Sequence, residues 1–598
     1  MNHPWKLTEG QITDSTGQVV DPLLITAALK DDDGRQIREE IPDIRFVHQS
    51  LEVIVEISGS APANMQLAVG VWKNNSCHTT DPNSSQIIIN NVWHQISPES
   101  IEIIQELMNR HELIEGSITL GKYINLIADD KSDLHVKDNS IQENSPDSWG
   151  ILSEIKPPSD LNAEMYSYQL SGSAAMRTLA KNDLGCLLAD EMGLGKTLQV
   201  ISLLLDTIEE GPSLVIMPAS LLVNWEREIK LFAPKLKTLI HAGPRRTGVL
   251  SGLDGFDVIL CSYETAVLDR SFIEEMDWNV LVLDEAQKIK NPESKRSNII
   301  KTFKCRIPVA VTGTPVENYL TDMWSIYEFV LPELLGSKEG FEGEFENTVS
   351  DAVNLGRVIA NFTIRRKVLE VAKDLPPRIE NIIPLELPEE ARKEYAKIEA
   401  TVEKSAATLI LRAFCGNFGE GKNLELFMDS PKIQQLKMMA EEIYAQKQKL
   451  LIFASNTATL DWLKKEMLLL DGFEGVHAEI IDGRTKNENR QEIVDNFNSS
   501  EDPGCLLLNP MAGGVGLNIT GANHVIHFNP EWNPAVTEQA TARAYRRKQT
   551  LPVFVSHFYY RNTVEEEVVH KALSKTEIAN ALDMGTVMEQ ESEHETNT

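Results

Sequence analysis

Cysteine is scarce in this sequence: 598 residues contain six, and no two of them form a CxxC pair. Zinc sites commonly use such close pairs. Several of the cysteines lie in apolar runs such as GCLLAD and VILCSYE. We therefore expect buried free thiols in a reducing compartment.

Long hydrophobic runs are also absent. No apolar stretch reaches the roughly 18 residues that a membrane-spanning helix needs. The first residues, MNHPWKLTEG, lack the charged start and the apolar block of a signal peptide. These absences predict a cytoplasmic protein with no membrane partner.

Positive charge is in deficit, with 57 Lys and Arg against 89 Asp and Glu, which gives a formal net charge of −32. This balance excludes a protein that coats nucleic acid or anionic membrane through bulk electrostatics. Any contact with nucleic acid must therefore be local. The 42% hydrophobic and 24% charged content is that of a globular protein, and the length suggests three or four structural units.

The first 128 residues read as a β-rich (α+β) domain. LEVIVEIS alternates apolar and charged residues, and QLAVGVW and QIIINNVW continue the strand-like pattern. One helix is predicted after Ser97 and Pro98, which suit an N-cap and a first helical position. Residues 129–155 read as a polar linker, and the acidic segment 576–598 reads as a disordered tail.

Between the linker and the tail the pattern changes to short apolar runs separated by helix-length segments. CLLAD, SLVIMP, DVILCS, VLVLDE and IPVAVTG form one series, and KLLIFAS, AEIIDG, GCLLLNP and HVIHFNP form another. This alternation is typical of parallel α/β sheets. We predict two α/β units, 156–360 and 381–575, joined by a connection at 361–380.

A phosphate-binding turn is the clearest chemical motif. LLADEMGLGKTLQV is an apolar strand, a glycine-rich turn and a helix. Gly193 and Gly195 allow the bend, Lys196 supplies charge to the phosphates, and Thr197 can ligate Mg²⁺. The strict motif has a small residue where this chain has Asp190. The alternative is a glycine turn followed by a chance lysine.

An acidic pair follows a second buried strand in VLVLDEAQKIKN. Asp284 and Glu285 would lie at the carboxyl end of the sheet, where α/β proteins bind ligands. Asp284 would hold Mg²⁺, and Glu285 would orient and polarise the attacking water. Taken alone, such a pair could simply begin a solvated helix.

A third motif is an arginine pair in QATARAYRRKQT. Good helix formers surround Arg543 and Arg546, so we expect a helix on which the two share a face. Adjacent guanidinium groups repel each other unless an anion lies between them. The alternative is a solvated basic face.

In this order the motifs resemble those of the Swi/Snf-like branch of superfamily two helicases, which are ATP-driven translocases on double-stranded DNA. The resemblance runs from about residue 165 to 570 and fits bacterial members best. The matching segments also include YSYQLSG, LVIMPASLLVNWEREI, CSYETA, VTGTPVENYLTDMWSI, LIFASNTATLDWL and LLLNPMAGGVGLNITGANHVIHFNPEWNPA.

The resemblance implies two tandem RecA-like lobes that hydrolyse ATP with Mg²⁺. It assigns Gln169 to the adenine and Gly516, Arg543 and Arg546 to nucleotide sensing from the second lobe. The phosphates would be held by Gly193, Leu194, Gly195, Lys196 and Thr197. Arg365 and Arg366 resemble the family's brace between the lobes.

The same resemblance implies contacts with double-stranded DNA from both lobes. The candidates are Ser220, Ser262, Tyr263, Thr312, Gly513, Gly514 and Trp532. Each has an ordinary alternative, since hydroxyl residues are common at strand ends and Trp532 could belong to the core.

The sequence departs from the family pattern at a few positions. Gln287 stands where the family has His, and Tyr545, Arg547 and Lys548 replace His, Ile and Gly. None of these changes removes a phosphate ligand, but coupling between DNA and ATP could differ.

The leading hypothesis is a nucleoid-associated, DNA-dependent ATPase that displaces or remodels DNA-bound protein, in polymerase recycling, repair or antiviral defence against foreign DNA. One alternative is a strand-separating or RNA-directed helicase. Another is an ATP-gated scaffold that binds a protein partner through its N-terminal domain.

Overall fold

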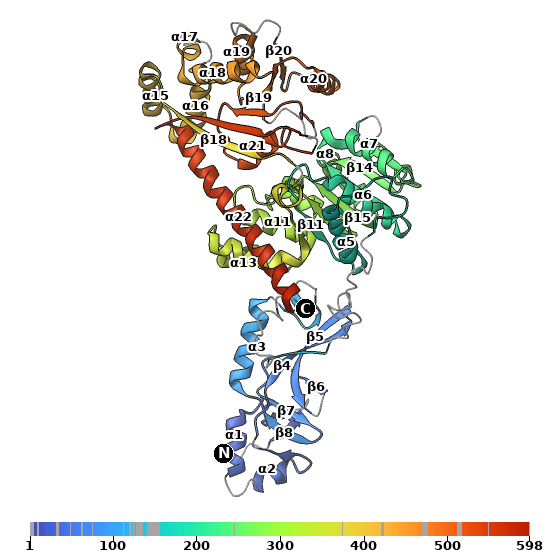
Figure 1. Ribbon diagram of the computed structural model, residues 1–598. Helices are drawn as coiled ribbons and strands as arrows, with labels where there is room; N and C mark the ends of the chain where they lie inside the picture. The colour runs from blue at the N-terminus through green and yellow to red at the C-terminus, as the bar shows by residue number, and fades with distance from the viewer. Residues whose placement is uncertain are drawn as a thin grey trace. The chain divides into compact units, whose positions relative to one another are not determined.

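The computed structural model describes residues 5–8, 11–30, 35–47, 49–60, 64–73, 76–111, 113–118, 122–123, 126, 135–139, 156–243, 246–373, 375–419, 424–468, 476–510, 517–547 and 549–596. The chain divides into two compact units, one of residues 1–151 with 331–341 and one of residues 152–330 with 342–598. Figure 1 traces the chain from the N-terminus in blue to the C-terminus in red.

The N-terminal unit is built from short sheets. Its largest sheet has the order β10–β4–β5–β6, with β9 also paired to β5, and it is joined by the sheet β3–β8–β7 and the hairpin β1–β2. The strands are β1 (Lys6–Thr8), β2 (Gln11–Thr13), β3 (Arg45–Phe46), β4 (Val53–Ser60), β5 (Asn64–Lys73), β6 (Ser76–Thr79), β7 (Gln86–Ile89), β8 (Val92–Gln95), β9 (Gly116–Ser117) and β10 (Val136–Asp138). The helices are α1 (Pro22–Lys30), α2 (Arg35–Glu40) and α3 (Pro98–Arg110). The predicted β-rich α+β unit is confirmed.

Two sequence expectations in this unit can be compared with the structure. The predicted helix is α3, which begins at Pro98 with Ser97 as its N-cap residue, although the Ser97 side chain makes no capping bond. Part of the predicted linker 129–155 is instead the strand β10, which pairs with β4 in parallel. Val136 explains the difference, because its side chain is buried in the sheet.

Lobe 1, the first half of the second unit, contains a seven-stranded sheet in which every pair is parallel. Its order is β13–β14–β12–β15–β16–β11–β17. The strands are β11 (Cys186–Leu188), β12 (Ser213–Met217), β13 (Thr238–His241), β14 (Val258–Ser262), β15 (Trp278–Asp284), β16 (Cys305–Val311) and β17 (Thr363–Ile364). Every residue of β12 and β14 is buried, as expected for strands covered on both faces.

The main helices of lobe 1 follow these strands in alternation. They are α5 (Ser167–Lys181), α6 (Lys196–Asp206), α7 (Leu222–Phe232), α8 (Tyr263–Leu268), α10 (Lys295–Ile300), α11 (Thr321–Val330), α13 (Val349–Ile359) and α14 (Val368–Val371).

Lobe 2 contains a six-stranded sheet, also parallel throughout, in the order β18–β23–β22–β19–β21–β20. The strands are β18 (Arg378–Leu385), β19 (Lys449–Phe453), β20 (His477–Ile481), β21 (Gly504–Leu508), β22 (His524–His527) and β23 (Val553–Tyr560). The main helices are α15 (Glu389–Thr401), α16 (Lys404–Asn417), α18 (Pro431–Ala445), α19 (Thr457–Leu468), α20 (Asn487–Ser499) and α21 (Pro534–Thr541).

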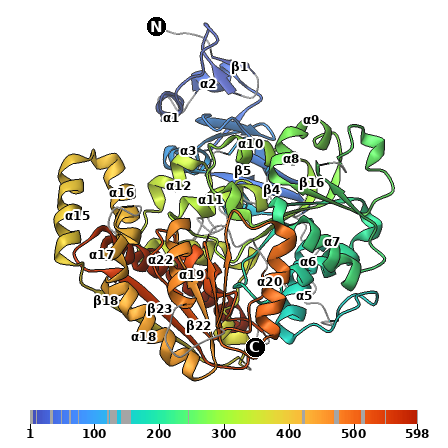
Figure 2. The same ribbon diagram turned by 90° about the horizontal axis from the view of Figure 1, so that it is seen from above.

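The core of lobe 2 lies on both faces of its sheet, because successive residues of a strand point to opposite sides. Leu450 and Ile452 pack into one apolar cluster with residues of α16, α18 and α19. Leu451 and Phe453 pack into the other with residues of α20 and α21. Helices therefore flank the sheet on both sides (Figure 2), and the predicted pair of tandem parallel α/β lobes is confirmed.

The C-terminal segment differs from the expectation of a disordered tail at 576–598. Helix α22 (Val564–Thr596) continues through most of it and packs along α13 of lobe 1, as Figure 1 shows in red. Ala581, Leu582 and Thr586 are buried. The acidic composition of the last residues concealed this apolar face of the helix.

Candidate nucleotide site

The glycine-rich turn lies between β11 and α6, with backbone conformations that only glycine adopts easily. Gly193 has φ 86° and Gly195 has φ 76°, both in the left-handed region. Gly195 is the N-cap of α6, so the positive end of the helix faces the turn. The Lys196 ammonium donates to the carbonyl oxygens of Asp190 at 2.8 Å and Glu191 at 3.4 Å. The turn therefore has the geometry of an anion site.

Gln169, the residue assigned to the adenine, lies against this turn. Its Nε2 donates to the Leu194 carbonyl at 2.9 Å, and its Oε1 accepts from the Tyr166 amide at 3.0 Å. A side chain at Gly195 would overlap the Gln169 amide. The Tyr168 hydroxyl also donates to the Leu194 carbonyl, at 3.0 Å.

The acidic pair lies at the carboxyl end of β15 as predicted, with Asp284 as the last residue of the strand. Asp284 accepts from the Trp225 indole at 2.8 Å and from the Glu285 amide at 3.0 Å. Burial and the adjacent charge of Glu285 raise the pKa of Asp284 to about 7. Burial lowers the pKa of Lys196, which the charges of Glu285, Asp190 and Asp284 oppose.

These residues fit a hard divalent cation. The Thr197 hydroxyl and the Asp284 carboxylate are oxygen donors of the kind Mg²⁺ prefers. The adjacent carboxylates of Asp284 and Glu285 repel each other, and a cation beside them would relieve that repulsion. Among the described residues, no cluster of three or more His, Cys, Asp or Glu side chains offers a metal cage of its own.

Asp190, the departure from the strict phosphate motif, is explained by an ion pair. Its fully buried carboxylate accepts from Arg366 Nε at 2.8 Å and Nη2 at 2.6 Å, and Gln199 donates to it at 2.9 Å. This bidentate pair joins the segment after β17 to the turn. Arg366 thus acts on the nucleotide turn itself.

Gln287, the second departure, links the acidic pair to the end of β16. Its Nε2 donates to Glu285 Oε2 at 2.7 Å, and its Oε1 accepts from the Thr312 hydroxyl at 2.8 Å. The Glu285 carboxylate is therefore oriented by an amide in place of an imidazole. Sequence reasoning noted Gln287 but did not foresee this connection, nor the indole of Trp225.

The prediction that Arg543 and Arg546 share a helix face is wrong. Helix α21 ends at Thr541, and both arginines lie in the turns that follow. Arg543 is buried, with its guanidinium 5.8 Å from the Phe453 ring, and burial lowers its pKa to about 10.

Arg546 alone of the two is placed against the turn of lobe 1. A Cβ built on Gly193 would lie 3.4 Å from the Arg546 Cβ. Tyr168 and Leu194 of lobe 1 also share an apolar cluster with Ala544 and Tyr545 of lobe 2. The structure thus joins residues that the sequence separates by more than three hundred positions. Gly516 lies outside the described residues.

The residues predicted to touch DNA fall into two groups. Ser262, Tyr263 and Thr312 are buried in lobe 1. Tyr263 donates to the Asp284 carbonyl at 2.9 Å, and Ser262 caps α8 by accepting from the Thr265 amide at 3.1 Å.

The other group reaches the surface or is not described. Ser220 is exposed and Trp532 is partly buried, with the Lys571 ammonium 5.1 Å from its ring centre. Gly513 and Gly514 lie outside the described residues.

Comparison with known proteins places these features in one family. An SNF2-related domain matches residues 168–451, and a helicase conserved C-terminal domain matches residues 433–548. The chain belongs to the SNF2-related family. The first match covers lobe 1 and extends into lobe 2 as far as β19, and the second match covers lobe 2 from α18 to the turns after α21.

Individual SNF2-related relatives are similar over most of this chain. An uncharacterised ATP-dependent helicase of Mycoplasma genitalium is 34% identical over 499 residues, 79% of this chain and 47% of the relative. YwqA of Bacillus subtilis, provisionally named an ATP-dependent helicase/translocase, is 34% identical over 450 residues, 70% of this chain and 48% of the relative. The chain thus spans about half the length of these curated relatives.

A solved SWI2/SNF2 ATPase core of Sulfolobus solfataricus, in complex with double-stranded DNA, is 30% identical and covers 73% of this chain and 98% of its own, with a TM-score of 0.39. The family assignment rests on the sequence matches.

Two remaining expectations concern thiols and membranes. All six cysteines are free, and Cys186, Cys261, Cys415 and Cys505 are buried. No helix in the described part of the chain is both long and apolar enough to cross a membrane.

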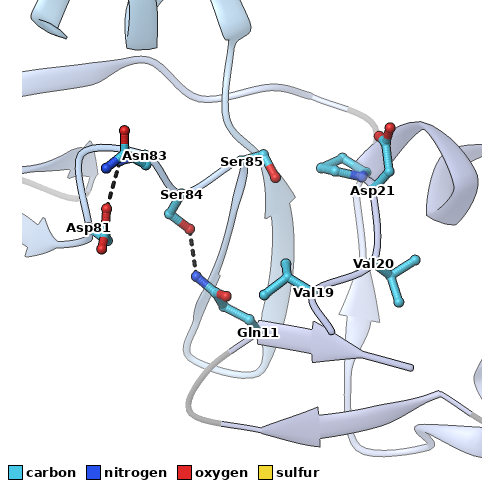
Figure 3. A pocket seen from close by; sticks show the side chains of 9 residues that line it. Gln11, Val19, Val20, Asp21, Asp81, Asn83, Ser84 and Ser85 are labelled. Atoms are coloured by element: carbon cyan, nitrogen blue, oxygen red, sulfur yellow. Dashed lines mark hydrogen bonds between the residues drawn. The ribbon is translucent and has the colours of Figure 1, made fainter. Parts of the chain in front are cut away.

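The N-terminal unit has a separate polar cleft of about 500 Å³. It is lined by Gln11, Val19, Val20, Asp21, Pro22, Asp81, Asn83, Ser84 and Ser85. Gln11 Nε2 donates to the Ser84 hydroxyl across it at 2.7 Å (Figure 3).

Proposed function

We propose that this chain is an ATP-dependent translocase on double-stranded DNA that displaces or remodels bound protein without separating the strands. The observation that carries the proposal is the approach of Arg546 from lobe 2 to Gly193 in the turn of lobe 1. A site completed by two lobes opens and closes with its nucleotide, and that movement can drive steps along a duplex.

The nucleotide chemistry is divided among the motifs. Lys196 and the backbone amides of the turn bind the phosphates, and Thr197 and Asp284 would hold Mg²⁺. When bound, the ion neutralises charge on the phosphate oxygens and positions them. Glu285, held by Gln287, orients the attacking water.

The second lobe supplies cationic groups. Arg546 stabilises the charge that develops on the transferred phosphoryl group, and an arginine in this role is worth about 10³ to 10⁵ in rate. In our proposal Arg543 and Gly516 also sense the nucleotide. Because Arg543 is buried beside Phe453, a movement of the lobes has to bring its guanidinium to the phosphates.

Contact with DNA is proposed for both lobes. Ser220 on lobe 1 and Trp532 on lobe 2 present side chains to the surface, and phosphate contacts that ignore base sequence suit a translocase. Ser262, Tyr263 and Thr312 would contribute through backbone groups. Tyr263 bonds the Asp284 carbonyl, and Thr312 bonds Gln287, which holds Glu285, so these two residues would relay DNA contact to hydrolysis.

Two alternatives predict different behaviour. A strand-separating or RNA-directed helicase would respond to single strands or RNA. An ATP-gated scaffold would use the polar cleft of the N-terminal unit (Figure 3) to bind a protein partner, and would hydrolyse ATP slowly with any nucleic acid.

The test is ATP hydrolysis measured without nucleic acid and with duplex DNA, single-stranded DNA or RNA, using Glu285→Gln as the inactive control. Strong stimulation by duplex that the control lacks supports the translocase. Stimulation by RNA or single strands alone favours the helicase alternative. Absence of stimulation by every nucleic acid contradicts the proposal and favours the scaffold.

A further inference from the structure

Helix α22 lies outside every motif discussed so far, yet it touches both lobes. It follows β23 of lobe 2 and crosses α13 of lobe 1 where each helix has a glycine. A Cβ on Gly356 would overlap the Leu582 carbonyl and lie 3.0 Å from Gly585 Cα. The two backbones are therefore in direct contact, and neither glycine leaves room for a side chain.

One end of this crossing reaches the nucleotide site. Asp583 accepts from Arg365 Nε at 3.1 Å and Nη2 at 3.3 Å, and both side chains are nearly buried. Arg365 Nη1 donates in turn to the Gly313 carbonyl at 3.0 Å and to the Ala189 carbonyl. Ala189 precedes the phosphate-binding turn, and Gly313 follows Thr312. Asp583 thus holds the arginine that ties these two loops together.

The other end reaches the segments proposed to meet DNA. The Lys575 ammonium donates to Asn318 Oδ1 of lobe 1 at 2.8 Å and to the Trp532 carbonyl of lobe 2 at 3.1 Å. Lys571, one turn earlier, lies over the Trp532 ring. One side chain of α22 therefore bridges the lobe 1 loop that holds Asn318, six residues after the DNA candidate Thr312, and the lobe 2 loop that holds the DNA candidate Trp532.

We propose that α22 couples DNA contact to ATP hydrolysis, with Lys575 and Asp583 as positioning residues at its two ends. The proposal rests on the proposed function. Eight residues of helix separate them, about 12 Å along a rigid rod. A duplex that moves Trp532 or Asn318 displaces Lys575, and the helix transmits the shift through Asp583 to Arg365 and the loops it holds.

The first test compares duplex stimulation of ATP hydrolysis in full-length variants. Asp583→Asn and Lys575→Gln should each lower the ratio of stimulated to basal rate by at least about fivefold, the lower range of allosteric couplings. Asp583→Glu should restore part of it. Glu577→Gln, which removes a charge from an exposed position of the same helix, is the matched control and should keep the full ratio.

The double variant decides whether the two residues act together. If both residues work through α22, the double variant Asp583→Asn with Lys575→Gln should lose no more stimulation by duplex than the more affected of the two single variants. Independent, multiplying losses would overturn the coupling.

A second test needs no DNA and keeps this inference separate from the proposed function. Amide hydrogen exchange of the full chain should be faster at residues 189–195 and 312–314 in Asp583→Asn than in wild type or Glu577→Gln. If wild type shows no response to duplex but exchange changes as expected, the translocase proposal fails and the positioning role of Asp583 stands. Unchanged exchange in a folded Asp583→Asn variant overturns that role.

Discussion

At the scale of single residues, Arg547 shows what a departure from the family pattern can do. Its guanidinium lies 3.5 Å from the centre of the Tyr166 ring and 5.5 Å from that of Tyr168. The Tyr166 amide is bound by Gln169, which also holds the carbonyl of Leu194. An arginine of lobe 2 thus stacks on lobe 1 beside the proposed adenine site, where isoleucine could not make the same contact.

Replacing Arg547 with Ile, the residue usual in the family, should weaken closure of the lobes. A cation–π contact is worth about 0.5 to 2 kcal/mol, so kcat/KM for ATP should fall about 2- to 30-fold. Steady-state hydrolysis over a range of ATP concentrations measures this. Tyr166→Leu should give a similar loss, and a clear loss in one variant but not the other would contradict the stacking role.

Lys432 and Glu565 form a buried ion pair in lobe 2, with the two side chains 0% and 1% exposed and 2.8 Å apart. Lys432 also donates to the Phe528 carbonyl at 2.9 Å. Lys432→Met leaves Glu565 buried without its cation, which should cost about 3 to 5 kcal/mol. Urea unfolding followed by a probe in lobe 2 gives the change.

Lys437 provides the comparison for that prediction. It pairs with Glu466 closer to solvent, with side chains 37% and 18% exposed. Lys437→Met should cost no more than about 1 kcal/mol. Equal costs for the two lysines would mean that burial does not set the strength of the Lys432 pair.

At the scale of elements, β22 carries two histidines, His524 and His527, whose lowered pKa values should make lobe 2 sensitive to acid. His527 stacks on His557 with ring centres 4.9 Å apart, and burial, His557 and Arg378 push the pKa of His527 well below its usual value. Burial lowers the pKa of His524 to about 4. Glu380 faces the stack through its bond to His557 at 2.6 Å.

A histidine with a lowered pKa makes the folded state less stable as pH falls. Between about pH 6.5 and pH 4, His524 is protonated in the unfolded chain but stays neutral in the folded protein, because its folded pKa is near 4. Each such histidine should cost about 1.4 kcal/mol per pH unit in that window. Urea unfolding of lobe 2 between pH 7.5 and 5 measures the slope.

In His524→Gln, the free energy of unfolding should fall less steeply with decreasing pH, by about 1.4 kcal/mol per pH unit. His477→Gln is the control, because His477 is exposed at the start of β20. A slope that does not change in His524→Gln would show that other groups govern the acid sensitivity.

The same scale shows which elements the sequence could predict. The turn before Lys196 and the acidic pair after β15 were found because each follows a short apolar run, a pattern set by local burial. The helix predicted across Arg543 does not form there, although the local helix propensity is good. Tertiary packing instead places the Arg543 guanidinium against Phe453. The part of α22 beyond residue 575 was missed because Leu582 and its neighbours are buried by packing against α13, a distant segment that the acidic local sequence does not reveal.

At the scale of the whole molecule, the order of the two lobes could be predicted from the sequence, but the contacts between distant segments could not. Asp190 and Arg366 lie 176 positions apart, and Arg365 and Asp583 lie 218 apart. Local patterns cannot identify such pairs, because each residue alone resembles a solvated charge. Arg365 and Arg366 were expected to brace the lobes: Arg365 pairs with Asp583 of α22, and Arg366 pairs with Asp190 beside the glycine-rich turn.

The net charge of −32 leads to a prediction about how the chain finds DNA. Protein and duplex repel at long range, so added salt should assist encounter as the screening length falls from about 30 Å at 0.01 M to about 10 Å at 0.1 M. The association rate constant should therefore stay level or rise over this range.

The salt dependence of DNA affinity should instead lie in the dissociation rate constant. Phosphate contacts, once formed, are lost to competing cations, so the dissociation rate constant should rise with salt. Stopped-flow binding of a labelled duplex separates the two rates. Salt suppresses steering of DNA by a positive surface. An association rate constant that falls tenfold or more as salt is added would therefore show that a local basic surface outweighs the net negative charge.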